Sequence, residues 1–295
     1  RGVSASMTAQ NVPLAGFINV NKSAGVSSAR EVAIIKRLTG VPCGHMGTLD
    51  PMASGVLPIA VGNATRLFDF FLSKRKTYIA EFTFGIETDT LDVTGTVIRQ
   101  GGAIPSAEQI EGALPSLAGE YDQVPPLYSA KSVGGRRAYQ IARSGGEVEL
   151  APKRVSVGRF TLSGEVKCGV FRFEIECGAG TYIRSLARDL AALLGTYATM
   201  SALTRTKSGP FEIENSVETR ELSRENIAAS LIPADSVLPY PRKVLSSGEE
   251  KKYLNGVPLN CALEKGEYRI YRADGTFYGV GTSDGTILKS RLKLC

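Results

Sequence analysis

Hydrophobic and polar residues alternate along several short runs of the chain, which predicts β-strands at these places. Tyr78, Ala80, Phe82 and Phe84 alternate with more polar neighbours, which is the period of a strand with one buried face. Further strands are expected at residues 17–20, 55–61, 159–162 and 170–177. The run at 55–61 (GVLPIAV) indicates a buried strand.

Four helices are predicted from capping residues and glycine stops. Their expected ranges are 28–39, 106–117, 136–143 and 181–194. Ser28 and Glu31 form a capping-box pattern at the first helix, which Gly40 ends, and Ser106 and Gln109 open the second. Strands and helices mix without a regular βαβ rhythm. The expected fold class is therefore α+β, with a mostly antiparallel mixed sheet.

A smaller second unit is predicted after the segment LPYPR at 238–242. Ser247 and Glu250 suggest a short capped helix, and Asp-Gly turns at 274–275 and 284–285 separate alternating runs. These patterns predict a β-rich unit of about fifty residues. From residue 241 onward the chain has ten Lys and Arg against six Asp and Glu, so most of its charge excess lies in this unit.

Composition narrows the class of protein without deciding it. A hydrophobic content of 43% suffices for a sizeable core, and 22% charged residues argue against wholesale disorder. The net charge of +6 fits a nucleic-acid partner, although many basic enzymes bind none. No run approaches eighteen apolar residues, so no membrane span is expected.

Cysteine and histidine usage excludes several kinds of site. The five cysteines are odd in number and form no CxxC motif, so neither a zinc site nor a disulfide framework is indicated. Cytosolic thiols are the simpler interpretation, and a cytoplasmic protein is expected. His45 is the only histidine, which excludes histidine-rich metal sites and Ser-His-Asp triads elsewhere in the chain.

The segment GHMGTLDP at 44–51 is the most unusual stretch of the chain. Asp50 precedes a proline and is therefore held extended, while Gly44, Gly47 and Gly55 allow the backbone to approach a ligand closely. A carboxylate presented in this way suits a nucleophile or a general base. The alternative is that Asp50 only shapes a turn, as Asp-Pro pairs often do.

Two further segments carry candidate binding groups. Residues 178–184 (GAGTYIR) join a strand to a helix, where Arg184 could pair with a buried carboxylate or with phosphate. The segment 128–143 interleaves basic residues with Tyr128 and Tyr139, which suits RNA. Its basic residues are Lys131, Arg136, Arg137 and Arg143. A loop that binds nothing and a solvated charged face are the respective alternatives.

In combination these motifs resemble one known family. GHMGTLDPMASGVLPIAVGNATR at 44–66 closely resembles the catalytic motif of TruB-type tRNA pseudouridine synthases. Further matches follow in the family's order: Asn21-Lys22 with Gly25, Lys76-Thr77-Tyr78, GAGTYIRSLARDL at 178–190 and LTRTKSGPF at 203–211. The resemblance covers nearly the whole chain, and the basic C-terminal unit looks, more loosely, like the family's PUA-type RNA-binding domain.

The resemblance implies a division of the chain and a substrate. Residues 1–12 would be an N-terminal extension, 13–240 a pseudouridine synthase catalytic domain and 241–295 a PUA-like domain. An insertion at about 120–152 would clamp the RNA stem-loop. The implied reaction is isomerisation of uridine to pseudouridine, at uridine 55 in the TΨC loop of tRNA. The enzyme would use no cofactor or metal, have no protein partner and be a monomer.

The resemblance also implies residue roles. Asp50 would be the catalytic aspartate, Arg184 would pair with it, and Tyr78 would stack on the base and help remove the proton at C5. His45 would keep the nucleotide flipped out, and Lys22 would support the floor of the site. Leu203 would pack against the flipped base, and Tyr182 belongs with the base-binding residues. Lys131, Arg136, Arg137 and Arg143 would contact the RNA.

Two motifs depart from the family's pattern at their edges, and other interpretations stay open. Asn21-Lys22-Ser23 stands where the family usually has Asp-Lys-Pro, and Met46 stands where the family often has a small or hydroxyl residue. Asp50 could attack the base, attack C1′ or remove a sugar proton. An RNA-folding factor with incidental catalysis is one alternative function, and a carboxylate-dependent hydrolase of nucleosides or sugars is another.

Overall fold

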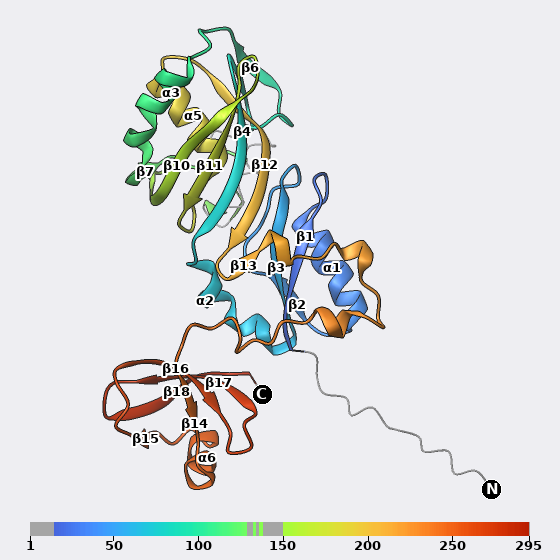
Figure 1. Cartoon of the computed structure of the whole chain (residues 1–295), viewed down its shortest axis with the longest axis vertical. Coiled ribbons are helices and arrows are strands. Elements are labelled where there is room, and N and C mark those ends of the chain that lie inside the picture. The colour runs from blue at the N-terminus through green and yellow to red at the C-terminus, as the bar shows by residue number, and fades with distance from the viewer. Residues whose placement is uncertain (1–14, 129–131, 134–135, 138–149, 295) are drawn as a thin grey trace, which may run out of the picture.

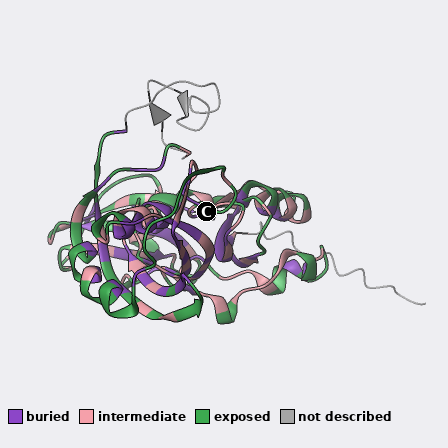
Figure 2. Cartoon of the chain, turned by 90° about the horizontal axis from the view of Figure 1, so that it is seen from above, coloured by how far each residue is buried: buried purple, intermediate pink, exposed green. Residues whose placement is uncertain are grey.

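The computed structural model describes residues 15–128, 132–133, 136–137 and 150–294 (Figure 1). Two main sheets organise this part of the chain, together with helices on their faces, which confirms the α+β class. Seen from above, the strands near the centre are largely buried, whereas helices at the rim expose much of their surface (Figure 2). Within these ranges no helix is both long enough and apolar enough to cross a membrane.

The larger sheet has nine strands, and the order of its main path is β1-β3-β12-β4-β11-β10-β7, with β2 paired to β3 and β13 to β12. All its strand pairs are antiparallel except β3 with β12. The mostly antiparallel mixed sheet is therefore confirmed. The strands are β1 Gly16–Lys22, β2 Cys43–His45, β3 Ser54–Val61, β4 Lys76–Phe84, β7 Gly119–Gln123, β10 Lys153–Lys167, β11 Val170–Cys177, β12 Ala198–Ser208 and β13 Phe211–Glu212.

Strands β3 and β12 approach each other closely at the centre of this sheet. Gly55 pairs with Arg205, and a Cβ atom at Gly55 would lie only 2.2 Å from the Arg205 carbonyl oxygen. Gly55 also has φ +98°, a conformation that side chains disfavour. The segment that carries Asp50 runs directly into β3, so this contact sets where it enters the sheet.

Helices cover the sheet, and shorter elements connect its strands. Helix α5 (Ile183–Leu193) buries Ile183, Leu186 and Leu190 in the main hydrophobic core. The other helices are α1 Ser28–Thr39, α2 Phe68–Leu72, α3 Ala107–Ala113 and α6 Ser247–Leu254. The 3-10 helices are η1 Gly62–Leu67, η2 Leu114–Leu117, η3 Ile213–Asn215, η4 Thr219–Glu221 and η5 Ile227–Ser230. Two small hairpins pair β5 Ile86–Thr88 with β6 Val97–Gln100 and β8 Ser132–Val133 with β9 Arg136–Arg137.

The helix ends correct some of the sequence predictions. The capping box of Ser106 and Gln109 is present, and Gly40 ends α1 in the left-handed conformation, with φ 73°. Ser27, rather than Ser28, is the N-cap of α1, because its side chain accepts a hydrogen bond from the backbone N–H of Arg30. The cap of α6 is likewise one residue earlier than predicted, at Ser246 with Glu249.

The predicted helix at 136–143 is wrong at its start, since Arg136–Arg137 forms strand β9. Residues 138–143 lie outside the described residues, as does most of the expected insertion at 120–152. Helix α5 begins at Ile183 rather than at residue 181, because Tyr182 is its N-cap with an extended backbone.

The C-terminal unit is a separate five-stranded sheet with the order β14-β16-β17-β18-β15. Its strands are β14 Arg242–Val244, β15 Leu259–Asn260, β16 Gly266–Tyr271, β17 Phe277–Ser283 and β18 Ile287–Lys293. Tyr253, Ile270, Tyr278 and Leu288 are among the residues that form its small core. This confirms the β-rich C-terminal unit, whereas the exact domain limits and the PUA-like assignment stay predictions.

The end of β18 attaches this unit to the rest of the protein. Asn63 donates its side-chain N–H to the Leu294 carbonyl oxygen at 2.9 Å, and Arg66 donates to that of Lys293 at 2.9 Å. Leu294 also belongs to the hydrophobic cluster around Phe17 and Phe71. The segment GNATR at 62–66 therefore anchors the C-terminus.

Candidate active site

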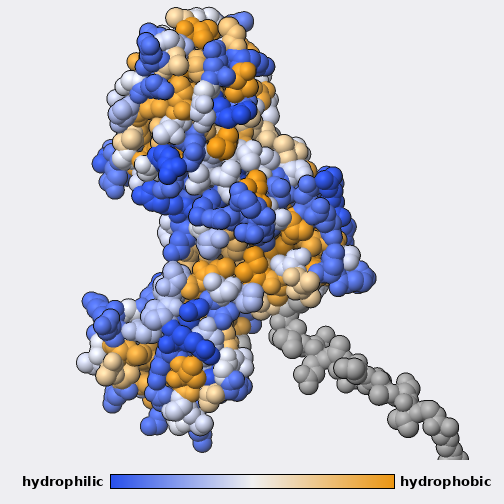
Figure 3. All heavy atoms as spheres, viewed as in Figure 1, coloured by the Kyte–Doolittle hydropathy of each residue, from blue (hydrophilic) through white to orange (hydrophobic). Residues whose placement is uncertain are grey.

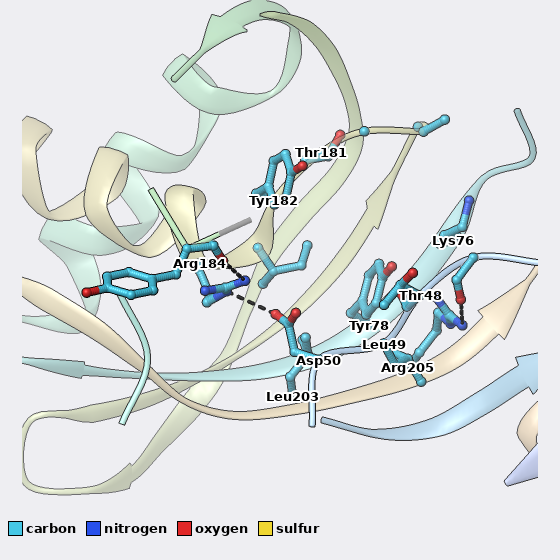
Figure 4. A pocket seen from close by; sticks show the side chains of 16 residues that line it. Thr48, Leu49, Asp50, Lys76, Tyr78, Thr181, Tyr182, Arg184, Leu203 and Arg205 are labelled. Atoms are coloured by element: carbon cyan, nitrogen blue, oxygen red, sulfur yellow. Dashed lines mark hydrogen bonds and ion pairs between the residues drawn. The ribbon is translucent and has the colours of Figure 1, made fainter. Parts of the chain in front are cut away.

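A pocket of about 310 Å³ opens beside the loop that carries Asp50. Its walls come from distant parts of the sequence: the Asp50 loop, β4, β12 and the segment that enters α5 (Figure 4). The lining residues include Asp50, Tyr78, Tyr182, Arg184 and Leu203. The structure thus gathers five of the site residues predicted from sequence around one cavity, of a size suited to a small ligand.

An ion pair joins Asp50 to Arg184 across this pocket. The Arg184 Nε lies 2.9 Å from Asp50 Oδ2, and the Arg184 and Asp50 side chains are 7% and 35% exposed, respectively. Arg184 is therefore buried, while the carboxylate stays accessible from the cavity. The dashed line in Figure 4 shows this pair, with the carboxylate facing the guanidinium.

The remaining nitrogens of Arg184 are also engaged. Nη1 donates to the Thr90 carbonyl oxygen at 3.0 Å, and Nη2 donates to that of Tyr128 at 3.2 Å. Nη1 lies 3.5 Å from Oδ2 of Asp92, a buried carboxylate. Because the planar guanidinium is held at several points, it presents Nε to Asp50 in a fixed direction.

Asp92 is a residue of this site that the sequence interpretation missed. Its Oδ1 accepts hydrogen bonds from the hydroxyl of Thr90 at 2.9 Å and from the backbone N–H of Thr94 at 3.0 Å. Two carboxylates thus share one arginine. No local pattern marks Asp92, since a lone aspartate beside threonines is also typical of a turn.

Arg205 is the second residue missed, and it holds the Asp50 loop from behind. It is fully buried, and it donates from Nε to the Val56 carbonyl oxygen at 2.7 Å and from Nη2 to that of Gly47 at 3.0 Å. Its position two residues after Leu203 could have indicated it, since alternate residues of a strand face the same side. An arginine on an inward face needs several hydrogen-bond acceptors.

Lys22 lies beneath the loop rather than in the pocket. Its ammonium group donates to the carbonyl oxygens of Val26 at 2.7 Å, Ser23 at 3.0 Å and Pro51 at 3.2 Å. Burial lowers the pKa of Lys22, opposed by the charges of Glu31 and Asp50. The contact with Pro51 places a positive group directly behind the residue that follows Asp50, consistent with a supporting role.

Tyr78 and Leu203 form the apolar wall of the pocket from neighbouring strands. Both residues are 7% exposed. Burial raises the pKa of the Tyr78 phenol, and the nearby Arg205 guanidinium opposes this rise. Tyr78 is therefore a neutral phenol at ordinary pH, and its side chain lines the pocket.

Tyr182 lines the pocket at the start of α5, and a buried glutamine fixes its backbone. Its N–H donates to Gln123 Oε1 at 2.8 Å, and its carbonyl oxygen accepts from Gln123 Nε2 at 3.2 Å. Gln123 is 1% exposed and was not predicted from sequence. This pairing links β7 to the strand-to-helix loop of the site.

Of the other predicted binding residues, only His45 can be placed relative to this pocket. His45 lies on β2 and is not among the lining residues. Its buried Nδ1 has no hydrogen-bond partner within the described part of the chain, and burial lowers its pKa. Lys131 and Arg143 lie outside the described residues, and of Arg136 and Arg137 the structure describes the strand β9 but not the side chains.

Comparison with known proteins identifies the class. Residues 36–183 match the model of the TruB family pseudouridylate synthase N-terminal domain, and residues 184–250 match the tRNA pseudouridylate synthase B C-terminal domain. Both models describe pseudouridine synthases, enzymes that isomerise uridine within RNA.

The curated relatives agree. A tRNA pseudouridine synthase B of Clostridium kluyveri is 37% identical over 90% of this chain and 94% of its own length. That of Clostridium novyi is 38% identical over 93% of this chain and 97% of its own. The chain therefore belongs to the TruB family of tRNA pseudouridine synthases.

Solved structures support the fold independently of sequence. A chain in the crystal structure of a Cbf5-Nop10-Gar1 complex superposes with a TM-score of 0.70 at 22% identity, covering 95% of this chain and 85% of that chain. A chain in an archaeal box H/ACA Nop10-Cbf5 complex gives 0.68 at 23% identity, covering 96% and 87%. At these identities the likeness establishes the fold alone.

Proposed function

We propose that this enzyme converts uridine 55 in the TΨC loop of tRNA to pseudouridine, with Asp50 as its catalytic residue. The observation that carries the proposal is the ion pair between Asp50 and buried Arg184, at the edge of a pocket lined by Tyr78 and Leu203. Relatives named tRNA pseudouridine synthase B support tRNA as the substrate.

The arrangement suits a reaction that detaches a base and rejoins it. The C1′–N1 bond breaks, the uracil turns, and a C1′–C5 bond forms; C5 then loses a proton and N1 gains one. Asp50 supplies a carboxylate that is partly open to the cavity, and Arg184 fixes its direction. The fixed pair requires little reorganisation when charge develops at the sugar.

Tyr78 and Leu203 would hold the base while it is detached. A base that leaves its stack costs a few kcal/mol, which contacts in the pocket must offset. The neutral Tyr78 ring can stack on uracil, and Leu203 completes an apolar wall. Tyr78 would also help remove the C5 proton, and the nearby Arg205 guanidinium favours the anionic form of the phenol because it opposes the rise that burial causes in the pKa of Tyr78.

Binding of the T stem-loop would extend beyond the pocket. Lys251, Lys252 and Lys289 are exposed on the C-terminal unit and can contact RNA phosphates. The insertion at about 120–152, with Lys131, Arg136, Arg137 and Arg143, is proposed as the clamp, and His45 as a support for the flipped nucleotide. We propose that the enzyme acts as a cytoplasmic monomer on the shape of this loop.

Position-resolved mapping tests the substrate. Unmodified tRNA transcript and a T stem-loop fragment are incubated with wild-type protein or with Asp50→Ala, without added cofactor. We expect pseudouridine at uridine 55 in both RNAs, and only with the wild type. Modification at another uridine would overturn the substrate assignment, and modification by Asp50→Ala would overturn the catalytic assignment. Binding without modification would instead favour an RNA-folding function.

A further inference from the structure

We propose that Ser28 is a positioning residue that fixes the direction of Asp50 by clamping the backbone of Leu49. The inference rests on the proposed catalytic role of Asp50. Ser28 is the first residue of α1 and is 3% exposed. Its hydroxyl donates to the Leu49 carbonyl oxygen at 2.8 Å and accepts from the Leu49 N–H at 2.9 Å.

The helix itself does not use this hydroxyl as its cap. Ser27 is the N-cap of α1, and its Oγ accepts from the backbone N–H of Arg30 at 3.2 Å. Ser28 instead reaches 21 residues along the chain to Leu49. A buried serine that engages both backbone groups of one residue in a loop restrains both torsion angles of that residue.

The position of Leu49 makes this restraint relevant to the carboxylate. The carbonyl group of Leu49 and the N–H of Asp50 belong to one planar peptide unit, so an anchored oxygen orients the start of Asp50. Leu49 also lines the pocket. The Ser28 clamp therefore acts one peptide unit before the side chain that faces Arg184.

Neighbouring carbonyl groups of the loop are held by other residues. Arg205 binds the carbonyl oxygens of Gly47 at 3.0 Å and Thr48 at 3.4 Å, and Lys22 binds that of Pro51 at 3.2 Å. The Asp50 carbonyl oxygen accepts from the Ala53 N–H at 3.0 Å. Together these contacts fix the loop on both sides of Leu49, so losing the clamp frees a short, defined segment.

Removal of the hydroxyl should slow the reaction without weakening substrate binding. In Ser28→Ala the buried N–H and carbonyl of Leu49 lose their partner, and the peptide can rotate. A misplacement of about 1 Å at a reacting group can cost about 100-fold in rate. We expect the single-turnover rate to fall by about 10- to 100-fold. The dissociation constant for tRNA should stay within about twofold, because Ser28 does not line the pocket.

The test compares Ser28→Ala with Ser27→Ala, which replaces the exposed serine at the start of the same helix. Single-turnover rates with enzyme in excess, tRNA affinity and melting temperature are measured for both, with Ser28→Thr as the variant that keeps the hydroxyl. We expect Ser27→Ala and Ser28→Thr to react at nearly the wild-type rate. A Ser28→Ala enzyme as fast as wild type, or a Ser28→Thr enzyme as slow as Ser28→Ala, would overturn the inference.

Two further variants cover the case in which Ser28→Ala does not fold and separate this inference from the proposed role of Asp50. If Ser28→Ala does not fold, Ser28→Cys supplies a somewhat larger thiol that hydrogen-bonds only weakly, and a rate below wild type, down to about one-tenth of it, is expected. An unchanged rate in Ser28→Cys would then contradict the clamp. Asp50→Asn separates the two proposals: if it stays active, the catalytic assignment fails, whereas an inactive Asp50→Asn beside a fully active Ser28→Ala refutes only the role of Ser28.

Discussion

Charged side chains are buried around Asp50, whereas the described charged side chains of the C-terminal unit are not. Around the pocket, Lys22, Asp92, Arg184 and Arg205 are buried, and each has several hydrogen-bonding partners. Among the described residues from 242 onward, Ser283 is the only buried polar or charged residue apart from tyrosines. On the face shown in Figure 3, hydrophilic residues surround smaller hydrophobic patches on the C-terminal unit.

The two regions therefore use charge in different ways. A buried charge costs free energy unless it is paired, and its partners then hold it in one orientation. Arg184 and Arg205 each fix one part of the Asp50 loop, whereas exposed lysines act over longer distances and are screened by salt. Substitutions near the pocket should therefore change rate or stability, and those in the C-terminal unit should change affinity.

After replacement of Asp50 itself, the largest effect is expected from Arg184→Lys, which keeps the charge but loses the planar guanidinium. One ammonium group cannot bind Asp50, Thr90 and Tyr128 from the same positions. We expect a loss of about 100- to 1000-fold in single-turnover rate. Arg159→Lys is the control, because Arg159 pairs with Glu174 on the exposed surface. Equal rates for the two variants would contradict the directional role of Arg184.

Arg205→Met should mainly reduce stability. The substitution leaves the carbonyl oxygens of Gly47 and Val56, which lie at part-buried and buried hydrogen bonds, without this donor. Each unpaired group costs about 1–3 kcal/mol, so the free energy of unfolding should fall by about 3 kcal/mol. Urea unfolding measures this loss. Arg172→Met, which breaks an exposed pair with Glu81, should lose less than about 1 kcal/mol. A similar loss of unfolding free energy in both variants would contradict the view that the buried arginine contributes more to stability than the exposed one.

Charge removal in the C-terminal unit should weaken binding instead. The triple variant of Lys251, Lys252 and Lys289 to Gln should bind tRNA about tenfold more weakly and lower the slope of affinity against salt by up to about 3. Its rate with enzyme in saturating excess should not change. Lys243→Gln is the control, because Lys243 already pairs with Glu249. Unchanged affinity of the triple variant would contradict a role in RNA binding.

These charge substitutions test RNA binding more specifically than deletion of the whole C-terminal unit would. The charge excess after Pro241 also predicts that deletion of this unit weakens tRNA binding more than it slows chemistry. Deletion would, however, also uncover the apolar cluster of Phe17 and Phe71 that packs with Leu294. Point variants leave that contact intact.

The smallest effect is expected for the contribution of His45 to the pH dependence of the free energy of unfolding. Burial lowers its pKa in the folded protein, so below about pH 6.5 the unfolded chain binds the proton more readily. The contribution of His45 to the free energy of unfolding should be full well above pH 6.5 and should decline as the pH falls through and below about 6.5. His45→Gln should flatten this dependence in urea titrations. Parallel curves for the two proteins would refute it.

Local patterns predicted the elements of this fold better than its network of polar contacts. The alternation that begins at Tyr78 and the buried run before Val61 each define a strand, because burial on a sheet has a period of two. Capping signals located α1 and α6 but placed both caps one residue late. Where serines are adjacent, composition alone does not decide which hydroxyl turns back to the helix.

The sequence predicted the motif residues of the site but not the residues that hold them in place. Asp50 and Arg184 stand in distinctive segments, and the structure brings them to 2.9 Å. Asp92, Arg205 and Gln123 act on residues far away in the sequence, such as Gly47, which lies 158 residues from Arg205, and no local spacing encodes such contacts. Their partners follow from strand register, such as the pairing of β3 with β12, and register depends on the whole sheet.

The most direct test of the catalytic role of Asp50 is single turnover by Asp50→Asn on tRNA labelled with tritium at C5 of uridine, with tRNA affinity measured on the same preparation. We predict affinity within a few-fold of wild type and tritium release slower by at least about 10⁴-fold. Release within tenfold of the wild-type rate, from a folded variant that binds tRNA normally, would show that the chemistry does not depend on this carboxylate.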